Sequence, residues 1–267
     1  MSILKVPGAQ LYYEVTGSGP LLILIPGAVG VGEVFRPLAH LLVAQYQVVT
    51  YDRRGFSRSS LDGSQDYDRR LEIDADDVWR LIEHLTDQQA TVFGNSSGAL
   101  VALEVISRSA ETVQTVVAHE PPAVSLLPDA AKWWAFFDAV YETYRKEGIP
   151  KAMHQFASGT VGDADHQLIE HFIREHANEH TLANAQYWME HELRQYPRAE
   201  LDLDALMVRA SRIVPAGGHD SHDQLTYQPN KMLARQLDRT IVDFPCGHLG
   251  FVSSPALFAQ ALIDTLS

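Results

Sequence analysis

The chain is poor in cysteine, because Cys246 is the single one among its 267 residues. No disulfide can therefore form within the chain, and a cytosolic location is expected. The N-terminal residues lack a basic segment followed by an apolar core of signal-peptide length. No run approaches the roughly 18 apolar residues that a membrane span needs. These absences predict a soluble, cytoplasmic protein.

Basic residues are also scarce, since 21 Lys and Arg stand against 34 Asp and Glu, for a formal net charge of -13. This balance disfavours nucleic acid and anionic membranes as partners and favours a neutral, hydrophobic small molecule. Recognisable cofactor motifs are missing too: there is no HExxH, and Gly27-Ala28-Val29-Gly30 lacks the dinucleotide-binding spacing. We expect no metal and no cofactor. The sequence leaves the oligomeric state, a homodimer included, open.

The segments that are present alternate between strand and helix patterns. Ile3 to Val6 and Gln10 to Val15 predict an antiparallel edge. Leu21 to Ile25 is a continuous apolar run, as expected for a central strand that is covered on both faces. Helical and strand patterns then alternate up to the strand predicted at Val113 to Ala118. Together they predict an α/β fold with a mostly parallel, doubly wound sheet.

A serine stands at a predicted sharp turn. The sequence Gly94-Asn95-Ser96-Ser97-Gly98 follows a short β-branched and aromatic run and precedes an apolar helical stretch. The glycines on both sides let the chain reverse, so Ser96 should lie at the apex with its hydroxyl exposed. The Ser97 N–H at the start of the helix would stabilise negative charge, as would the Ala28 N–H in the glycine loop after the central strand.

Other reactive side chains also follow predicted strands, where the functional groups of a parallel sheet gather. A serine needs an imidazole to accept its proton, and the imidazole needs a carboxylate on its other nitrogen. His248 follows a late strand in a Gly-His turn, so we expect it to be the base. Several other histidines fall in polar helical sequence and are expected to be solvated, namely His166, His171, His176, His180 and His191.

Two carboxylates compete to orient His248. Asp220 follows a late strand, but in a histidine-rich stretch that could be a solvated loop. Glu120 is wedged between an apolar strand and Pro121-Pro122, where an unpaired carboxylate would be costly. We favour Glu120, with Asp220 as the alternative, and expect a Glu120 oxygen about 2.6–3.2 Å from Nδ1 of His248.

The alternating pattern stops after Glu120. From Ala123 to about Leu206 there is no convincing strand, and aromatic residues lie in helical sequence. We interpret residues 123–206 as a helical lid inserted into a core formed by residues 1–122 and 207–267. Most of the aromatic side chains should form the core of the lid itself. Tyr187 and Trp188 are expected to line an apolar, substrate-binding cleft over Ser96.

Three stretches resemble the motifs of one enzyme family: Gly94 to Ala99, His119 to Pro122, and Phe244 to His248 with Val252 to Pro255. They are similar to those of the fungal zearalenone lactonases, in the α/β-hydrolase superfamily. The resemblance implies an α/β-hydrolase fold with an inserted lid, or cap, and a serine triad that opens a macrolactone. It implies Glu120 as the triad acid and Ala28 and Ser97 as oxyanion donors, although Ala28 replaces the family's glycine and the lid matches poorly.

These observations predict a serine hydrolase that cleaves a carboxylic ester or lactone of a hydrophobic small molecule through an acyl-enzyme. A C–C bond hydrolase or a cofactor-free haloperoxidase uses the same scaffold, and a non-enzymatic small-molecule receptor is a further alternative. Haloalkane dehalogenases and epoxide hydrolases are disfavoured, because both need an aspartate where Ser96 stands.

Overall fold

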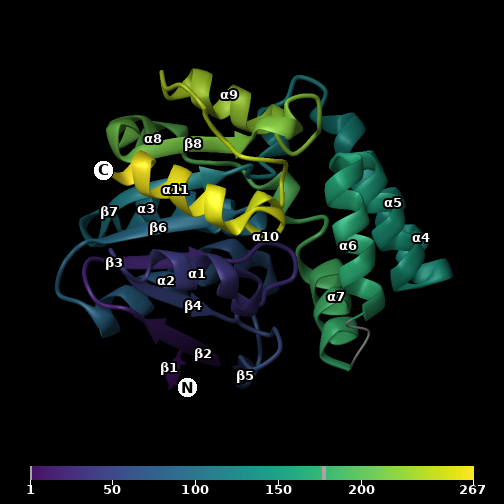
Figure 1. The fold of residues 1–267 in the computed structure, drawn as a ribbon. Coiled ribbons are helices and arrows are strands. Elements are labelled where there is room, and N and C mark those ends of the chain that lie inside the picture. The colour runs from purple at the N-terminus through teal and green to yellow at the C-terminus, as the bar shows by residue number, and fades with distance from the viewer. Residues whose placement is uncertain (1, 176–178) are drawn as a thin grey trace.

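The computed structural model describes residues 2–175 and 179–267, with the side chains of 173–179 excepted. The predicted antiparallel edge is present (Figure 1). β1 (Ser2–Val6) pairs with β2 (Ala9–Thr16), and β2 pairs antiparallel with β4 (Gln47–Tyr51) and β5 (Ser60–Leu61). The edge thus leads directly into the central part of the sheet.

The rest of the sheet is parallel. Among the described residues the strands lie in the order β1-β2-β4-β3-β6-β7-β8-β9, and β5 pairs with β2 beside this path. All pairs from β4 onward are parallel. The bounds of these strands are β3 (Leu21–Ile25), β6 (Ala90–Asn95), β7 (Val113–His119), β8 (Ile213–Gly218) and β9 (Val242–Phe244). The mostly parallel, doubly wound sheet predicted from the sequence is confirmed.

Helices cover both faces of this sheet, which is why β3 is buried along its whole length. Leu21, Ile23 and Ile25 pack with α2 and α3, whereas Leu22 and Leu24 pack on the other face with α1 and α11. The helices of this core are α1 (Arg36–Leu42), α2 (Arg70–Leu85), α3 (Ser97–Arg108), α8 (Leu203–Val208), α9 (Gln228–Gln236), α10 (Gly250–Ser253) and α11 (Pro255–Leu266).

Between β7 and β8 the chain forms a group of four helices, which we call the helical insert. Its members are α4 (Ala130–Glu147), α5 (Ile149–Thr160), α6 (Asp163–Glu175) and α7 (Glu179–His191). They stand together to one side of the sheet (Figure 1). No strand occurs in the described part of 120–212, as the sequence predicted. The insert has its own apolar core, which includes Phe137, Val140 and Trp188.

In the parts of the chain that the structure describes, no helix is both long and apolar enough to cross a membrane.

Candidate active site

Ser96 lies at the turn between β6 and α3, with φ 54° and ψ −124°. This conformation is strained for a residue with a side chain, and such strain is common at functional sites. The turn is held by the Ser96 N–H, which donates to the carbonyl of His119 at 2.9 Å, and by the Ser96 carbonyl, which accepts from Ala99 N–H at 2.8 Å. The serine predicted at a turn apex is therefore found there.

The glycines around Ser96 are required by close backbone approach. A Cβ on Gly94 would lie 2.2 Å from the carbonyl oxygen of Gly98, and one on Gly98 would lie 2.2 Å from that of Ile25. A Cβ on Gly27 would lie 2.9 Å from Cβ of Ser96. Because any larger residue would collide with backbone, the turn depends on these three positions.

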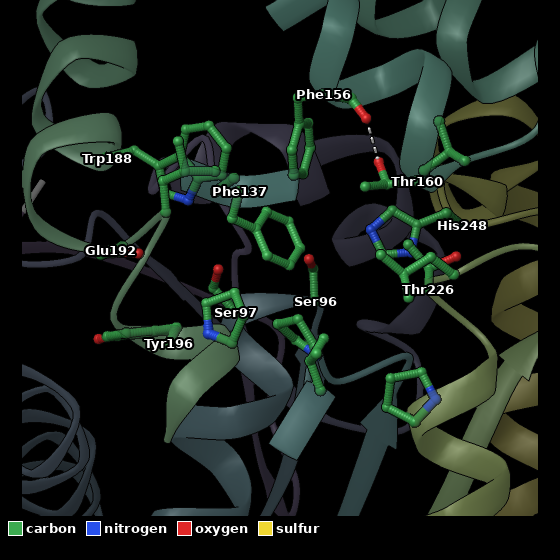
Figure 2. Close-up of a pocket in the computed structure, with 18 residues that line it drawn as sticks. Ser96, Ser97, Phe137, Phe156, Thr160, Trp188, Glu192, Tyr196, Thr226 and His248 are labelled. Carbon is green, nitrogen blue, oxygen red and sulfur yellow. Dashed lines mark hydrogen bonds between the residues drawn. The ribbon is translucent and has the colours of Figure 1, made fainter. Parts of the chain in front are cut away.

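Ser96 and His248 line the same small cavity, together with Ala28 and Ser97 (Figure 2). Its volume is about 40 Å³. The helical insert covers it with apolar side chains, among them Phe137, Phe156 and Trp188. Ser97 begins α3, so its N–H belongs to the first turn, where N–H groups have no acceptor within the helix. The predicted nucleophile, base and oxyanion donors thus meet at one place.

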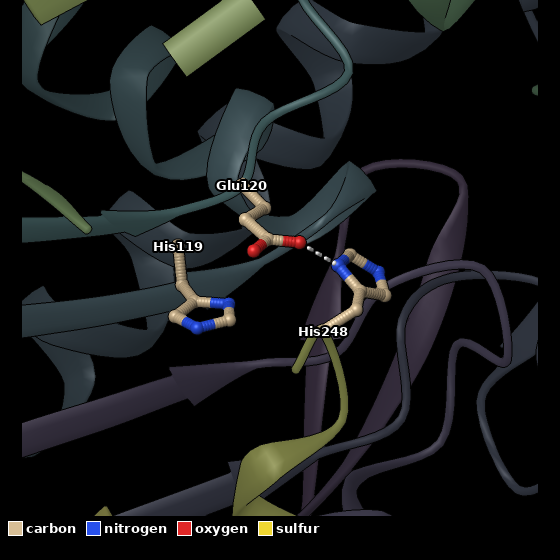
Figure 3. Close-up of side chains that lie close together, drawn as sticks. All are labelled: His119, Glu120 and His248. Carbon is tan, nitrogen blue, oxygen red and sulfur yellow. Dashed lines mark hydrogen bonds and ion pairs between the residues drawn. The ribbon is translucent and has the colours of Figure 1, made fainter. Parts of the chain in front are cut away.

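The carboxylate of Glu120 points toward the imidazole ring of His248 (Figure 3). Oε2 of Glu120 lies 2.6 Å from Nδ1 of His248, and Oε1 accepts the Gly218 N–H at 2.7 Å. Burial alone would raise the pKa of this carboxyl, but the hydrogen bond and charge of His248 and the Gly218 N–H hold it at about 2. Glu120 is therefore ionised, and the contact expected from the sequence is present.

The backbone is strained at further points beside this pair. Glu120 has φ 51° and Cys246 has φ 65°, although neither is glycine. Glu120 also precedes a proline, which restricts its backbone further. The Glu120 N–H donates to the carbonyl of Ala216 at 2.9 Å, which fixes the strained residue to β8. Strain thus gathers around Ser96, Glu120 and the loop of His248.

The pKa of His248 lies above its ordinary value. Burial disfavours the charged imidazole, but the hydrogen bond and charge of Glu120 and the charge of Asp165 outweigh it. Asp165 comes from α6 and also holds the backbone of this loop, because it accepts the N–H groups of His248 at 2.8 Å and Leu249 at 3.0 Å. Sequence reasoning missed Asp165, because it lies 83 residues away from His248.

A second buried histidine lies behind the pair. Nδ1 of His119 is 3.0 Å from Oδ1 of Asn95, and the side chain is fully buried. Burial lowers its pKa to about 4, with the charge of Glu120 opposing this and that of His248 adding to it. His119 is therefore neutral near pH 7. No sequence pattern singled out His119 separately from Glu120.

The structure does not bring Asp220, the alternative acid, to the ring. Its side chain is exposed on the turn after β8, and its backbone N–H donates to the carbonyl of Cys246 at 3.0 Å. Nδ1 of His248 is already occupied by Glu120. Asp220 therefore lies in a solvated loop, which was the alternative interpretation of this stretch.

Tyr187 and Trp188 face different directions, so the expectation for Tyr187 is wrong. Trp188 lines the cavity, with its ring 4.9 Å from that of Phe156. Tyr187 instead packs edge-on against Phe56, and its hydroxyl accepts a hydrogen bond from Arg70. Consecutive helical residues point about 100° apart, and with Trp188 toward the cavity the ring of Tyr187 is turned toward Phe56. Trp188 also borders a larger open cleft of about 560 Å³, which Ala28, Met153 and Asn184 line as well.

Arg53 anchors the loop that carries Ala28. Its guanidinium donates to the carbonyl of Gly27 at 3.1 Å, to Asp74 at 2.6 Å and to Glu192 at 2.8 Å, and its side chain is fully buried. Asp74 lies on α2 and Glu192 follows α7, so this ion-pair network joins the core to the end of the helical insert. Asp52, Arg53 and Arg54 lie in a turn, and nothing in the sequence indicated that these charged side chains are buried.

Three groups of described residues bring ligand-type atoms within 4.8 Å of one another: His119, Glu120 and His248; His154, His166 and Glu170; and His219, His222 and Asp243. Each contains hydrogen-bonded or ion-paired contacts, such as the 2.7 Å contact between Nδ1 of His154 and Glu170. Of the histidines expected to be solvated, His171 and His180 are exposed, whereas His191 stacks on Tyr67 at 3.7 Å and His166 is half-buried. His176 lies outside the described residues.

Known proteins are similar to this chain over most of its length. A family model described as the alpha/beta hydrolase fold matches residues 20–255. The hydrolase YraK of Bacillus subtilis is 34% identical over 269 residues, which cover 98% of this chain and 94% of YraK. A zearalenone hydrolase of Cladophialophora bantiana is 27% identical, over 99% of this chain and 95% of that protein. The solved structure of an esterase from Thermogutta terrifontis, at 19% identity, covers 100% of this chain and 98% of its own with a TM-score of 0.79, which shows a shared fold.

Proposed function

The chain belongs to the α/β-hydrolase family, and we propose that it is a serine hydrolase that cleaves a carboxylic ester or lactone of a hydrophobic small molecule. One observation carries this proposal. Ser96, at its strained turn, shares a cavity with His248, whose Nδ1 is held by the ionised Glu120. A serine, an imidazole and a carboxylate in this relation form the catalytic triad of acyl transfer.

In the proposed reaction the hydroxyl of Ser96 attacks the carbonyl carbon of the substrate. Since Nδ1 of His248 donates to Glu120, Nε2 accepts the proton of Ser96 and passes it to the leaving alcohol. Glu120 holds the tautomer and stabilises the imidazolium. The alcohol leaves an acyl-enzyme, which a water molecule then attacks with His248 again as the base.

The negative oxygen of each tetrahedral intermediate needs donors that are already in place. We assign the N–H groups of Ser97, in the first turn of α3, and of Ala28, in the loop anchored by Arg53. Both residues line the cavity beside Ser96. The positive end of the α3 dipole supports the same charge.

The size of the two cavities bears on the substrate. About 40 Å³ beside Ser96 admits only a small group, whereas the adjoining cleft of about 560 Å³ can hold a drug-sized molecule. We propose that the helical insert acts as the lid, with the reacting carbonyl below it and the bulk of the substrate in the larger cleft. Because one relative is named a zearalenone hydrolase, a macrolactone of that type is the first substrate to test.

The test is a panel of macrolactones, small lactones and linear esters, with products identified by mass spectrometry. We expect hydrolysis of at least one apolar member and a loss of several orders of magnitude in turnover in Ser96→Ala. Trapping the acyl group on Ser96 would support the acyl-enzyme. A Ser96→Ala variant with most of the wild-type rate would refute the mechanism, and binding without turnover across the panel would favour a small-molecule receptor.

A further inference from the structure

One carboxylate of the helical insert binds the loop that carries His248. Asp165 lies in the first turn of α6 and is 5% exposed. Oδ2 accepts the His248 N–H at 2.8 Å, and Oδ1 accepts the Leu249 N–H at 3.0 Å. Hydrogen bonds to a charged acceptor are among the stronger ones in proteins. Both carboxylate oxygens are thus used to hold two consecutive backbone groups of the core.

The loop is shaped to receive this carboxylate. A Cβ on Gly247 would lie 2.1 Å from Oδ2 of Asp165. The φ of Gly247 lies outside the positive range that favours glycine, so the backbone alone would accept an alanine. The close approach of Asp165 therefore explains why glycine precedes His248.

Asp165 also adds charge near the imidazole. Among the described residues, the titratable groups that face His248 are Glu120 and His119 at the end of β7 and Asp165 on α6. Cys246 lies on the same loop, two residues before His248. His119 is neutral near pH 7, so Glu120 and Asp165 provide the negative charge that favours the imidazolium.

We propose that Asp165 is a positioning residue that couples the helical insert to His248: it fixes the histidine loop and supplies a second negative charge for the imidazolium that forms during the reaction. This inference rests on the proposed serine hydrolase function. It gives the insert a part in the chemistry besides covering the cavity.

Asp165→Asn removes the charge and replaces one acceptor by an NH₂ group that faces a backbone N–H. The imidazole must be neutral to accept the proton of Ser96, and losing the charge lowers its pKa. The acid limb of kcat/KM should therefore move to lower pH, by about 0.5–1 unit. The plateau value of kcat should fall about 10- to 100-fold, because the loop is held less well.

Asp163→Asn is the matched control. Asp163 lies in the same first turn of α6 and carries the same charge, but its side chain is exposed. It should leave the plateau and the acid limb at their wild-type values. An unshifted limb in Asp165→Asn, or an equal shift in Asp163→Asn, overturns the proposal.

Gly247→Ala tests the same contact from the loop, and keeps the proposal testable if Asp165→Asn folds poorly. Its Cβ displaces the carboxylate, so it should lower kcat and shift the acid limb in the same direction. In the double variant the effects should not add, since both changes break one contact. Full additivity contradicts the coupling.

The imidazole can also be followed without turnover. Titration of His248 by NMR, in the wild type and in Asp165→Asn, should give the lower pKa in the variant. Equal values overturn the coupling, whether or not the chain hydrolyses esters. Failure of the serine mechanism shows up separately, in Ser96→Ala and in the substrate panel.

Discussion

Glu120 and Asp220, the two candidate acids for His248, can be distinguished by substitution. Glu120→Gln keeps the shape of the side chain but removes the charge and favours the wrong imidazole tautomer. We expect kcat to fall about 10³- to 10⁴-fold. Asp220→Asn changes an exposed side chain and should leave kcat close to wild type. The measurement is kcat on the best ester or lactone, and the reverse ranking would transfer the role to Asp220.

His119 makes folding stability depend on pH. Its pKa is about 4 in the folded chain and about 6.5 when unfolded, so unfolding favours proton uptake between these values. The stability that neutral His119 supports is fully present above about pH 6.5 and is lost as the pH falls to 4, by roughly 3 kcal/mol.

His119→Asn removes this titration and keeps a donor for Asn95. The variant should be less stable than the wild type at pH 7. The difference between their free energies of unfolding should be smaller by roughly 3 kcal/mol at pH 4. Urea unfolding of both proteins at the two pH values measures the gap. A gap that is the same at pH 7 and pH 4 would show that His119 does not titrate in this range.

At the scale of elements, α7 presents two aromatic residues to two environments, and its face toward the cavity can be tested. Trp188→Ala should raise KM for large substrates more than for a short acetate ester, because Trp188 borders both the small cavity and the larger cleft. Tyr187→Phe is the control, since the Tyr187 ring packs away from the cavity. Equal changes of KM for both substrates would show that Trp188 packs within the insert and does not contact the substrate.

The elements that short-range patterns specify were the predictable ones. The strand, turn and helix around Ser96 depend on glycines whose partners lie within a few residues or on the neighbouring strand. Glu120 could be placed because its flanking residues, an apolar strand and two prolines, leave a carboxylate few solvated positions. The phase of α7 could not be read from two adjacent aromatic residues, and Tyr187 was misplaced for that reason.

Polar contacts between segments far apart in the chain could not be predicted where, unlike at Glu120 and His248, no motif marks the residues. In the sequence, Asp165 is one of several polar residues of α6. Its role becomes visible only when α6 is seen to pack against the loop of His248. Arg53 and Glu192 are 139 residues apart, and nothing local to either indicates burial. A buried charge is recognised by its partner, and the partner is known only once the fold is known.

For the whole molecule, the buried network of Arg53, Asp74 and Glu192 joins core and insert, so its disruption should destabilise the entire fold. Asp74→Asn leaves buried guanidinium groups without full compensation and should cost about 3–5 kcal/mol in the free energy of unfolding. Glu72→Gln, on the same helix as Asp74, breaks exposed pairs with Arg69 and Arg108 and should lower the free energy of unfolding far less. Denaturant unfolding compares them, and similar small losses would mean that the network contributes little.

The position of the insert also delays the pairing of two neighbouring strands while the chain is being synthesised. β7 ends at His119 and its partner β8 begins at Ile213, so the 93 residues 120–212 separate the two neighbouring strands. At about 5–20 residues per second, the ribosome needs about 5–20 s to make that interval. Throughout it the nascent sheet carries an open edge at β7, where another unfinished chain can pair. The helices made in between rely on local contacts and can fold at once, so they are available to shield that edge until β8 emerges.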